Sequence, residues 1–298
     1  MKSLDHILIF GMGLMGGSLS LAIKKKYPDV KVTGIVRSEK SKIEIIESRI
    51  ADEAILESDF LLKANWGDYD FIIFATPVQT VVNYIPKLKN FKDLYITDLG
   101  STKKSIIDEV NLQFNEDHNY ISSHPMCGSE FSGPSAAKHD LYENKLCIVT
   151  RAEKSSLEAS DFVRNFWDKI GSWTMEMDAS EHDEILSYLS HLPHIISTIL
   201  VETAIQNKTV KKIVSASEKA ITGGGFRDMS RIAGSNYEMW ESIFTANKSF
   251  IHRSLIEFKT QIEQIINEFD PKKEIDREKL HQLWNDALKA KEIIQKTK

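Results

Sequence analysis

The stretch from Ile7 to Leu21 constrains the fold of this chain more than any other segment. It starts with four apolar residues that run directly into Gly11, Gly13 and Gly16, spaced as Gly-x-Gly-x-x-Gly. A buried strand, a glycine turn of this spacing and a helix are typical of dinucleotide-binding domains, because glycines permit a tight turn and a close approach to a pyrophosphate. The N-terminal amides of the helix then face the phosphates. The alternative interpretation is a glycine turn with a purely structural role.

Composition excludes several other classes of protein. A length of 298 residues allows two domains, and 42% hydrophobic with 27% charged residues is typical of a packed globular protein. A net charge of -5 gives no indication of nucleic-acid binding, and no apolar run approaches the roughly 20 residues of a membrane span. Cys127 and Cys147 lack metal-type spacing and suit a reducing compartment. We therefore expect a cytoplasmic protein without nucleic-acid, membrane or metal partners.

Strand and helix signals alternate along the first half of the chain and then stop. We expect strands at 7–10, 30–36, 70–75, 94–98, 120–123, 145–150 and 171–177, with helices at 41–49, 78–88 and 155–170 among those between them. This alternation predicts an α/β fold with a Rossmann-type doubly wound parallel sheet. The remainder is expected to be helical, at 180–208, 211–221, 229–247 with interruptions, 248–269 and 273–298. We predict a nucleotide-binding domain over residues 1–178 and an all-helical domain over 179–298.

The end of the second predicted strand discriminates between cofactors. NAD-binding domains usually place Asp or Glu there, where the carboxylate binds the ribose hydroxyls. This chain instead has Val36, followed by Arg37 and Ser38. A guanidinium beside a hydroxyl suits the 2′-phosphate of NADP, so we predict NADP over NAD, with NAD still possible. Alternatively, Arg37 is solvated or stacks on the adenine.

Further candidates lie where predicted strands end, which is the edge that faces the ligand in a doubly wound sheet. Thr76 and Pro77 follow the strand at 70–75, and Leu14 and Met15 complete the glycine turn. We expect all four to contact the cofactor. Ser101 follows the strand at 94–98 in an Asp-x-Gly-Ser-x-Lys turn, where it either caps a helix or binds a ligand.

Histidines and arginines supply the remaining candidates. His124 leads a loop rich in proline, glycine and serine, and an imidazole with a pKa of about 6.5 suits general base catalysis. His191 and His194 could form half a metal site, but no third ligand has a suggestive spacing. Gly223 to Arg231 contains Arg-Asp-x-x-Arg, which is either a carboxylate-binding fork or a solvated ion-pair cluster.

In this order, the motifs resemble those of the prephenate/arogenate dehydrogenases of tyrosine biosynthesis, and the resemblance spans nearly the whole chain. It rests on the glycine turn, Asp98-x-Gly-Ser-x-Lys103, His124-Pro-Met-x-Gly-Ser-Glu-x-Ser-Gly133, Ser190-His-Leu-Pro-His194 and Gly223-Gly-Gly-Phe-Arg-Asp-x-x-Arg231-Ile-Ala. The resemblance implies oxidative decarboxylation of prephenate to 4-hydroxyphenylpyruvate, or of arogenate to tyrosine, with hydride transfer to NAD(P). It also implies a homodimer formed through the helical domain.

The resemblance further implies roles for individual residues. His124 would accept the hydrogen bond of the ring hydroxyl and take its proton, with Ser101 supporting the same hydroxyl. Arg231 would bind a substrate carboxylate. The other implied substrate-binding residues are Ser129, Ser190, His194 and Trp240, the last contributing shape.

Three alternatives remain. Arogenate could replace prephenate as substrate, with Glu130 as a candidate partner for its amine. A β-hydroxyacid dehydrogenase has a similar glycine turn, but it needs a lysine early in the second domain, and none precedes Lys208 after residue 180. A non-catalytic NADP sensor would have no need for His124 and Arg231.

Overall fold

The computed structural model describes residues 4–63, 65–128 and 131–296. Two compact units divide the chain, Met1–Ile251 and His252–Lys298. Each unit is described by itself. The first contains every residue predicted from the sequence to belong to a site.

A five-stranded parallel sheet forms the centre of the first unit, in the order β3-β2-β1-β4-β5. Its strands are β1 (His6–Phe10), β2 (Lys31–Val36), β3 (Glu53–Leu56), β4 (Phe71–Phe74) and β5 (Tyr95–Asp98). The predicted α/β fold with a parallel sheet is confirmed. Strand β3 was not predicted, because four residues between polar neighbours carry too little periodicity.

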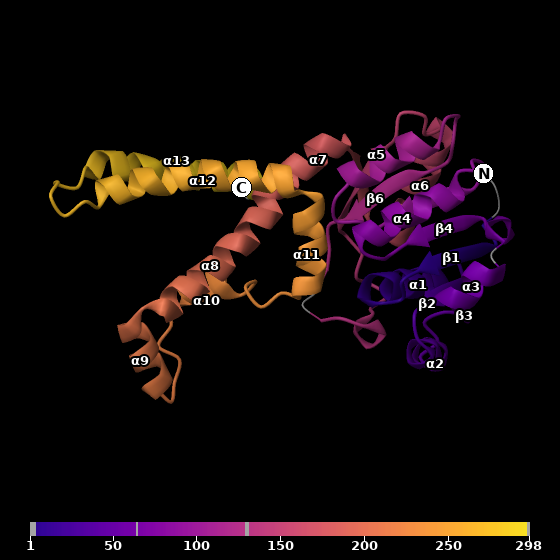
Figure 1. The fold of residues 1–298 in the computed structure, drawn as a ribbon, viewed down its shortest axis with the longest axis horizontal. Helices are drawn as coiled ribbons and strands as arrows, with labels where there is room; N and C mark the ends of the chain where they lie inside the picture. The colour runs from indigo at the N-terminus through magenta and orange to yellow at the C-terminus, as the bar shows by residue number, and fades with distance from the viewer. Residues whose placement is uncertain (1–3, 64, 129–130, 297–298) are drawn as a thin grey trace. The chain divides into compact units, whose positions relative to one another are not determined.

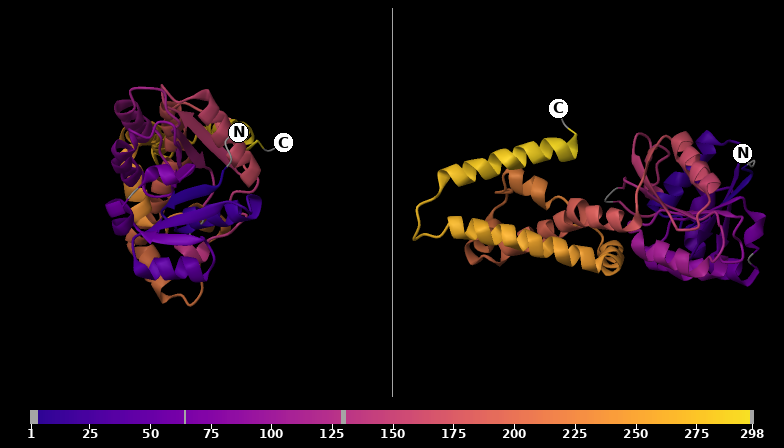
Figure 2. Two further views of the ribbon diagram at one scale, coloured as in Figure 1. Left: turned by 90° about the vertical axis from the view of Figure 1, so that its right-hand side faces the viewer. Right: turned by 90° about the horizontal axis from the view of Figure 1, so that it is seen from above.

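Helices cover both faces of this sheet (Figures 1 and 2). Ile7 and Ile9 of β1 share a core cluster with α1 (Leu14–Lys26) and α6 (Leu157–Ile170). Leu8 and Phe10 share the other cluster with α4 (Val78–Leu88) and α5 (Lys104–Gln113). Alternate residues of one strand therefore face opposite layers, which explains its uninterrupted apolar sequence. The shorter helices α2 (Glu39–Glu47) and α3 (Glu57–Lys63) precede and follow β3.

The last three strands form a separate sheet in the order β6-β7-β8. They are β6 (Ile121–Pro125), β7 (Leu146–Arg151) and β8 (Trp173–Glu176), and β6 runs antiparallel to β7. A single bridge between Ile96 and Tyr120 connects β5 to the start of β6. The expectation that His124 leads a loop is wrong, since it pairs with Ile148 within β6. A proline is tolerated at the following position because β6 is an edge strand.

The helix expected at 180–208 is one continuous helical run with an irregular centre. It comprises α7 (Ala179–Leu186), a π-helical turn (Ser187–His191) and α8 (Leu192–Gln206). Pro193 lies at the start of α8 and has no amide hydrogen to donate. A wider turn at this point accommodates the missing hydrogen bond, and such turns frequently occur at functional sites.

Four shorter segments follow: α9 (Lys208–Ala216), α10 (Gly224–Ser230), α11 (Tyr237–Ala246) and the beginning of α12 (Lys248–Glu268). The interruption expected within 229–247 lies between the end of α10 at Ser230 and Asn236, which caps α11. The second unit contains the rest of α12 and α13 (Arg277–Gln295), separated near Asp270 and Pro271 as predicted. Among the described helices, none is both long and apolar enough to cross a membrane.

Candidate active site

The glycine turn between β1 and α1 has a geometry that only glycine permits at two positions. Gly11 has a φ of +85°, and a Cβ there would lie 2.6 Å from the Ala75 carbonyl oxygen. A Cβ on Gly16 would lie 1.9 Å from the Gly11 carbonyl oxygen. Gly13 differs, since a Cβ built on it meets nothing within 4 Å. The open space beside Gly13, at the N-terminus of α1, suits a phosphate group.

The turn after β4 lies against this glycine turn. Ala75 contacts the Cβ positions of both Gly11 and Gly16, and Pro77 caps α4. The Thr76 hydroxyl oxygen is buried and has no hydrogen-bond partner among the described residues. Buried polar atoms are normally paired, so this hydroxyl is suited to bind a group of the cofactor.

The remaining two residues predicted in the glycine turn have different surroundings. Leu14 and Met15 begin α1, and the Met15 carbonyl accepts a hydrogen bond of 2.7 Å from the Tyr142 hydroxyl. The Met15 carbonyl therefore anchors α1 to a neighbouring segment.

Arg37 and Ser38 lie where β2 leads into α2. Arg37 is exposed, whereas Val36 is buried in the sheet. The Ser38 hydroxyl caps α2 by accepting a hydrogen bond of 3.2 Å from the Ser41 amide. Ser38 thus has a structural role that the sequence prediction did not include, and the cap brings Arg37 next to the N-terminus of a helix.

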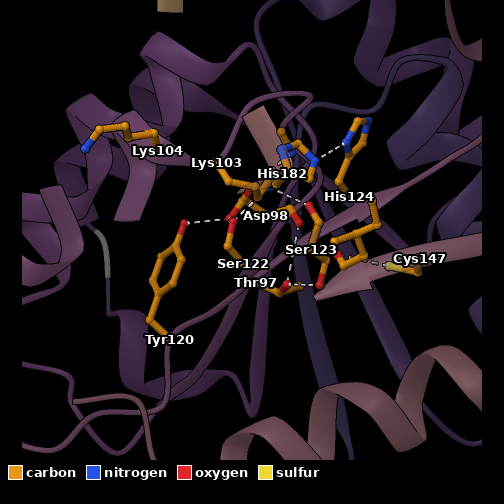
Figure 3. A network of polar contacts seen from close by, with 12 residues as sticks. Thr97, Asp98, Lys103, Lys104, Tyr120, Ser122, Ser123, His124, Cys147 and His182 are labelled. Carbon is orange, nitrogen blue, oxygen red and sulfur yellow. Dashed lines mark hydrogen bonds and ion pairs between the residues drawn. The ribbon is translucent and has the colours of Figure 1, made fainter. Parts of the chain in front are cut away.

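A buried polar network lies at the carboxyl end of β5 (Figure 3). Lys103 and Asp98 are both fully buried and form an ion pair of 2.7 Å. The Lys103 ammonium also donates to the Ser122 hydroxyl at 2.8 Å and to the Ser123 carbonyl at 2.7 Å. Asp98 accepts further hydrogen bonds from the Ser122 and Tyr120 hydroxyls. Every proton of the ammonium is therefore satisfied, as a buried charge requires.

His124 contacts a second histidine at the edge of this network (Figure 3). Its Nδ1 atom lies 2.8 Å from Nε2 of His182 on α7. Nδ1 of His182 lies 2.8 Å from Oδ1 of Asp183. The three side chains therefore form a hydrogen-bonded row that ends on a carboxylate.

Asp183 is held in place by the start of α5. Its Oδ1 atom accepts a hydrogen bond of 2.7 Å from the Lys103 amide, and its Oδ2 atom one of 2.9 Å from the Lys104 amide. A residue of α7 thus caps α5. The alternative role of Ser101 as this cap is wrong, and the half-buried Ser101 side chain lies just after β5.

The protein environment favours the neutral form of His124. Burial, together with the neighbouring His182, Lys103 and His191, holds the pKa of His124 well below its ordinary value of 6.5. His124 is partly exposed to solvent although protein atoms surround most of its ring. A neutral imidazole can accept a proton, which is what a general base requires.

The second cluster of predicted residues comes from α8, α10 and α11. The rings of His194 and Trp240 lie 3.9 Å apart between centroids, and the His194 Nδ1 atom donates to the Ser190 carbonyl at 2.9 Å. Burial and the nearby Arg231 guanidinium lower the pKa of His194. Arg231 is exposed at the C-terminus of α10, and the Trp240 indole nitrogen is buried without a partner among the described residues. The structure therefore brings these four predicted residues together.

Two predicted positions cannot be placed. Ser129 and Glu130 lie outside the described residues. Conversely, sequence reasoning missed His182, Asp183 and Asn247. Asn247 follows α11, and its amide nitrogen donates to the Asp183 carbonyl at 2.7 Å and lies 3.1 Å from Nδ1 of His191. A histidine beside an aspartate on one helix carries no spacing signal, because its partners are far away in the chain.

Metal binding has no support in the described residues. Within the ranges that the structure describes, no three His, Cys, Asp or Glu side chains lie where they could hold a metal ion. His191 is engaged by Asn247, and His194 by the Ser190 carbonyl.

Comparisons with known proteins agree over nearly the whole chain. Residues 19–176 match the family of the prephenate dehydrogenase nucleotide-binding domain, and residues 178–285 match the prephenate dehydrogenase dimerization domain. A prephenate dehydrogenase of Bacillus subtilis is 33% identical over 88% of this chain and 69% of its own length. A cyclohexadienyl dehydrogenase of Zymomonas mobilis is 30% identical over 83% of this chain and 82% of its own length. A crystal structure of prephenate dehydrogenase from Aquifex aeolicus, in complex with hydroxyphenyl propionate and NAD+, superposes with a TM-score of 0.83 at 27% identity, covering 98% of this chain and 99% of that one.

Proposed function

This chain belongs to the prephenate dehydrogenase family, and we propose that it oxidises and decarboxylates prephenate to 4-hydroxyphenylpyruvate. The observation that carries the proposal is His124, a histidine held neutral at the carboxyl edge of a nucleotide-binding sheet. In prephenate, one ring carbon carries a hydroxyl and a hydrogen, and the opposite carbon carries a carboxylate. Loss of the hydrogen as hydride together with carbon dioxide makes the ring aromatic.

In this proposal His124 is the general base. It takes the hydroxyl proton as the C–H electron pair leaves the ring, so that the hydroxyl carbon becomes a carbonyl-like centre. Breaking of the bond to the ring carboxylate then supplies the electrons that complete the aromatic ring. Ser101, which follows β5, would bind the same hydroxyl.

The cofactor would lie along the carboxyl edge of the parallel sheet. When bound, a nicotinamide dinucleotide accepts the hydride. Gly11, Gly13 and Gly16 would cradle its phosphates, and the unpartnered Thr76 hydroxyl would bind a polar group nearby.

Arg231, His194 and Trp240 would bind the substrate away from the reacting carbon. A guanidinium binds carboxylates in a bidentate way, and prephenate has two of them. Ser190 acts through its carbonyl, which orients the His194 ring. The buried Trp240 indole N–H, which has no partner within the described part of the chain, would donate to a substrate oxygen.

We further propose that NADP is preferred over NAD. Arg37 lies beside the N-terminus of α2, where helix amides and the guanidinium would both attract a 2′-phosphate. An Arg37→Ala variant should lose about ten- to a hundredfold in affinity for NADP, equivalent to the roughly 1.5–3 kcal/mol of a charged hydrogen bond, and little for NAD. Equal losses for both cofactors would contradict this role.

We also propose a homodimer formed through residues 179–298. In the second unit, α12 and α13 carry exposed apolar side chains, among them Ile266 on α12 and Trp284 and Leu288 on α13. Exposed apolar surface of this kind marks protein interfaces. Sedimentation of the purified protein would test the dimer directly.

The proposed activity is tested by mixing the purified protein with prephenate or arogenate and with NADP or NAD, in four pairs. Rapid formation of reduced cofactor with prephenate and NADP is the expected result. Turnover with arogenate alone would assign the alternative substrate. If NADP binds but none of the four pairs reacts, the proposed activity is wrong, and the protein is then a sensor or a hydroxyacid dehydrogenase.

A further inference from the structure

The row formed by Asp183, His182 and His124 has an order of donors and acceptors that can be worked out from one end. Both carboxylate oxygens of Asp183 already accept backbone N–H groups, from Lys103 and Lys104. They therefore act as acceptors toward His182 as well, which makes Nδ1 of His182 the donor in its 2.8 Å contact.

His182 has one proton to place. Its side chain is fully buried, and burial lowers its pKa below 6.5, so the neutral ring with a single N–H is the resting form. With that hydrogen on Nδ1, the Nε2 atom carries a lone pair. The 2.8 Å contact between His182 Nε2 and His124 Nδ1 therefore requires that His124 donates from Nδ1.

We propose that His182 and Asp183 are positioning residues that hold His124 in the tautomer with hydrogen on Nδ1 and the lone pair on Nε2. This rests on the proposed role of His124 as general base. The Nε2 atom is then the one that receives the substrate proton. After proton transfer, the row also offers the new positive charge a path of hydrogen bonds to the Asp183 carboxylate, as in other carboxylate and histidine pairs.

Besides His182, the Lys103 ammonium and the His191 ring influence the pKa of His124. Lys103 comes from the turn before α5 and is paired with Asp98 of β5, so its charge is locally balanced. His191, from the π-helical turn, is engaged by Asn247 and has a pKa lowered to about 4 by burial. Among the described residues, neither side chain is hydrogen-bonded to the His124 ring, whereas His182 is. We therefore attribute the tautomer of His124 to its hydrogen bond with His182.

The row also constrains where its parts lie in the fold. Asp183 joins α7 to α5 through backbone amides, and Asn247 joins the end of α11 to the Asp183 carbonyl. The start of α5 thus binds the Asp183 carboxylate, and the end of α11 binds the Asp183 backbone carbonyl. This arrangement gives the His182 ring a defined orientation toward β6.

The direct test is a nitrogen NMR spectrum of the resting protein with ¹⁵N-labelled histidine, at a pH above 7. The His124→Asn variant identifies the signals of His124 by their loss. We expect Nδ1 of His124 to be protonated and Nε2 to be unprotonated. The opposite tautomer, or an even mixture, would overturn the proposal. Because no substrate or cofactor is present, this result is independent of whether the proposed reaction is correct.

Two variants test the consequence for activity. His182→Leu removes the acceptor, and we expect kcat to fall roughly 10- to 100-fold, part of the 10²- to 10⁴-fold that a positioned base contributes, while KM changes little. The His124 spectrum of this variant should show a mixture of tautomers. In His182→Gln the amide oxygen can again accept from Nδ1, so both the tautomer and most of kcat should return. An equal loss of kcat in both variants, with an unchanged His124 spectrum, would contradict the role of His182 in fixing the His124 tautomer.

His118→Leu is the matched control. His118 is another buried histidine with a lowered pKa, and it lies outside the row. Its loss should destabilise the protein without changing the His124 tautomer. If this variant changed the tautomer as much as His182→Leu, a general loss of packing would account for both, and the proposal would fail.

Discussion

The glycine turn and the histidine row lie in the same unit but are assembled in different ways. Every residue of the turn lies between Gly11 and Gly16, and both the positive φ of Gly11 and the contact of Gly16 with the Gly11 carbonyl are local, although Ala75 also packs against the turn. The histidine row joins residues that are 58 positions apart at His124 and His182, and 80 apart at Lys103 and Asp183. Local geometry makes the glycine turn predictable from the sequence, whereas the histidine row depends on how distant segments pack.

The largest expected effect concerns the histidine half. Replacing His124 by Asn removes the proton acceptor, so turnover should fall by about 10²- to 10⁴-fold. Dinucleotide affinity should stay unchanged, because the glycine turn is separate. Steady-state rates and a cofactor titration measure the two quantities. Appreciable remaining turnover would remove His124 from the role of base.

The second prediction concerns Arg231 at the substrate end. Arg231→Gln should raise KM for the substrate by the equivalent of about 1.5–3 kcal/mol, the contribution of a hydrogen bond between charged groups. The neighbouring Arg227, also exposed on α10, provides a matched control, and Arg227→Gln should change KM far less. An equal effect of the two substitutions would mean that general positive charge, rather than Arg231, attracts the substrate.

The third prediction compares two glycines of the turn. Gly16→Ala places a Cβ 1.9 Å from a backbone oxygen, so the protein should lose about 1–3 kcal/mol of stability, as overpacked sites do. Gly13→Ala meets open space and should keep its stability while binding the cofactor more weakly. Denaturant unfolding and cofactor titration separate the two effects. A stable Gly16→Ala protein would show that the turn is less constrained than its geometry indicates.

The last prediction concerns the pH dependence of stability. His118, His182 and His191 are buried, and burial lowers the pKa of each below the value of 6.5 expected in the unfolded chain. Below pH 6.5 the unfolded state therefore binds more protons than the folded state. Stability should therefore fall as the pH drops below 6.5. His118 and His191, whose pKa values are lowered to about 4, should each contribute up to about 1.4 kcal/mol per pH unit between pH 6.5 and 4.

Unfolding free energies measured across this range check the slope. His118→Gln removes one titrating group, so the slope of the unfolding free energy against pH should become shallower by up to about 1.4 kcal/mol per pH unit. A flat profile between pH 6.5 and 4 would mean that these rings already accept protons in the folded state.

Strong local signals explain which parts of the fold could be predicted from the sequence. The parallel sheet, the helices that flank it and the long helical run after residue 179 all follow from apolar runs, glycines and prolines. β3 was missed because so short a segment depends on its neighbours. His124 was predicted as a candidate base, but it was assigned to a loop because prolines, glycines and serines follow it, whereas it lies within β6.

By itself, the sequence determined the nucleotide-binding half of this protein, since the spacing of Gly11, Gly13 and Gly16 sets backbone geometry over a few residues. It also supplied the candidate residues His124, His194 and Arg231. Only the tertiary structure decided that Asp183 caps α5, that His182 stands between Asp183 and His124, and that Trp240 packs on His194. The physical reason is that a hydrogen bond between side chains depends on separation in space, which the packing of α7, β6 and α11 sets and no local pattern records.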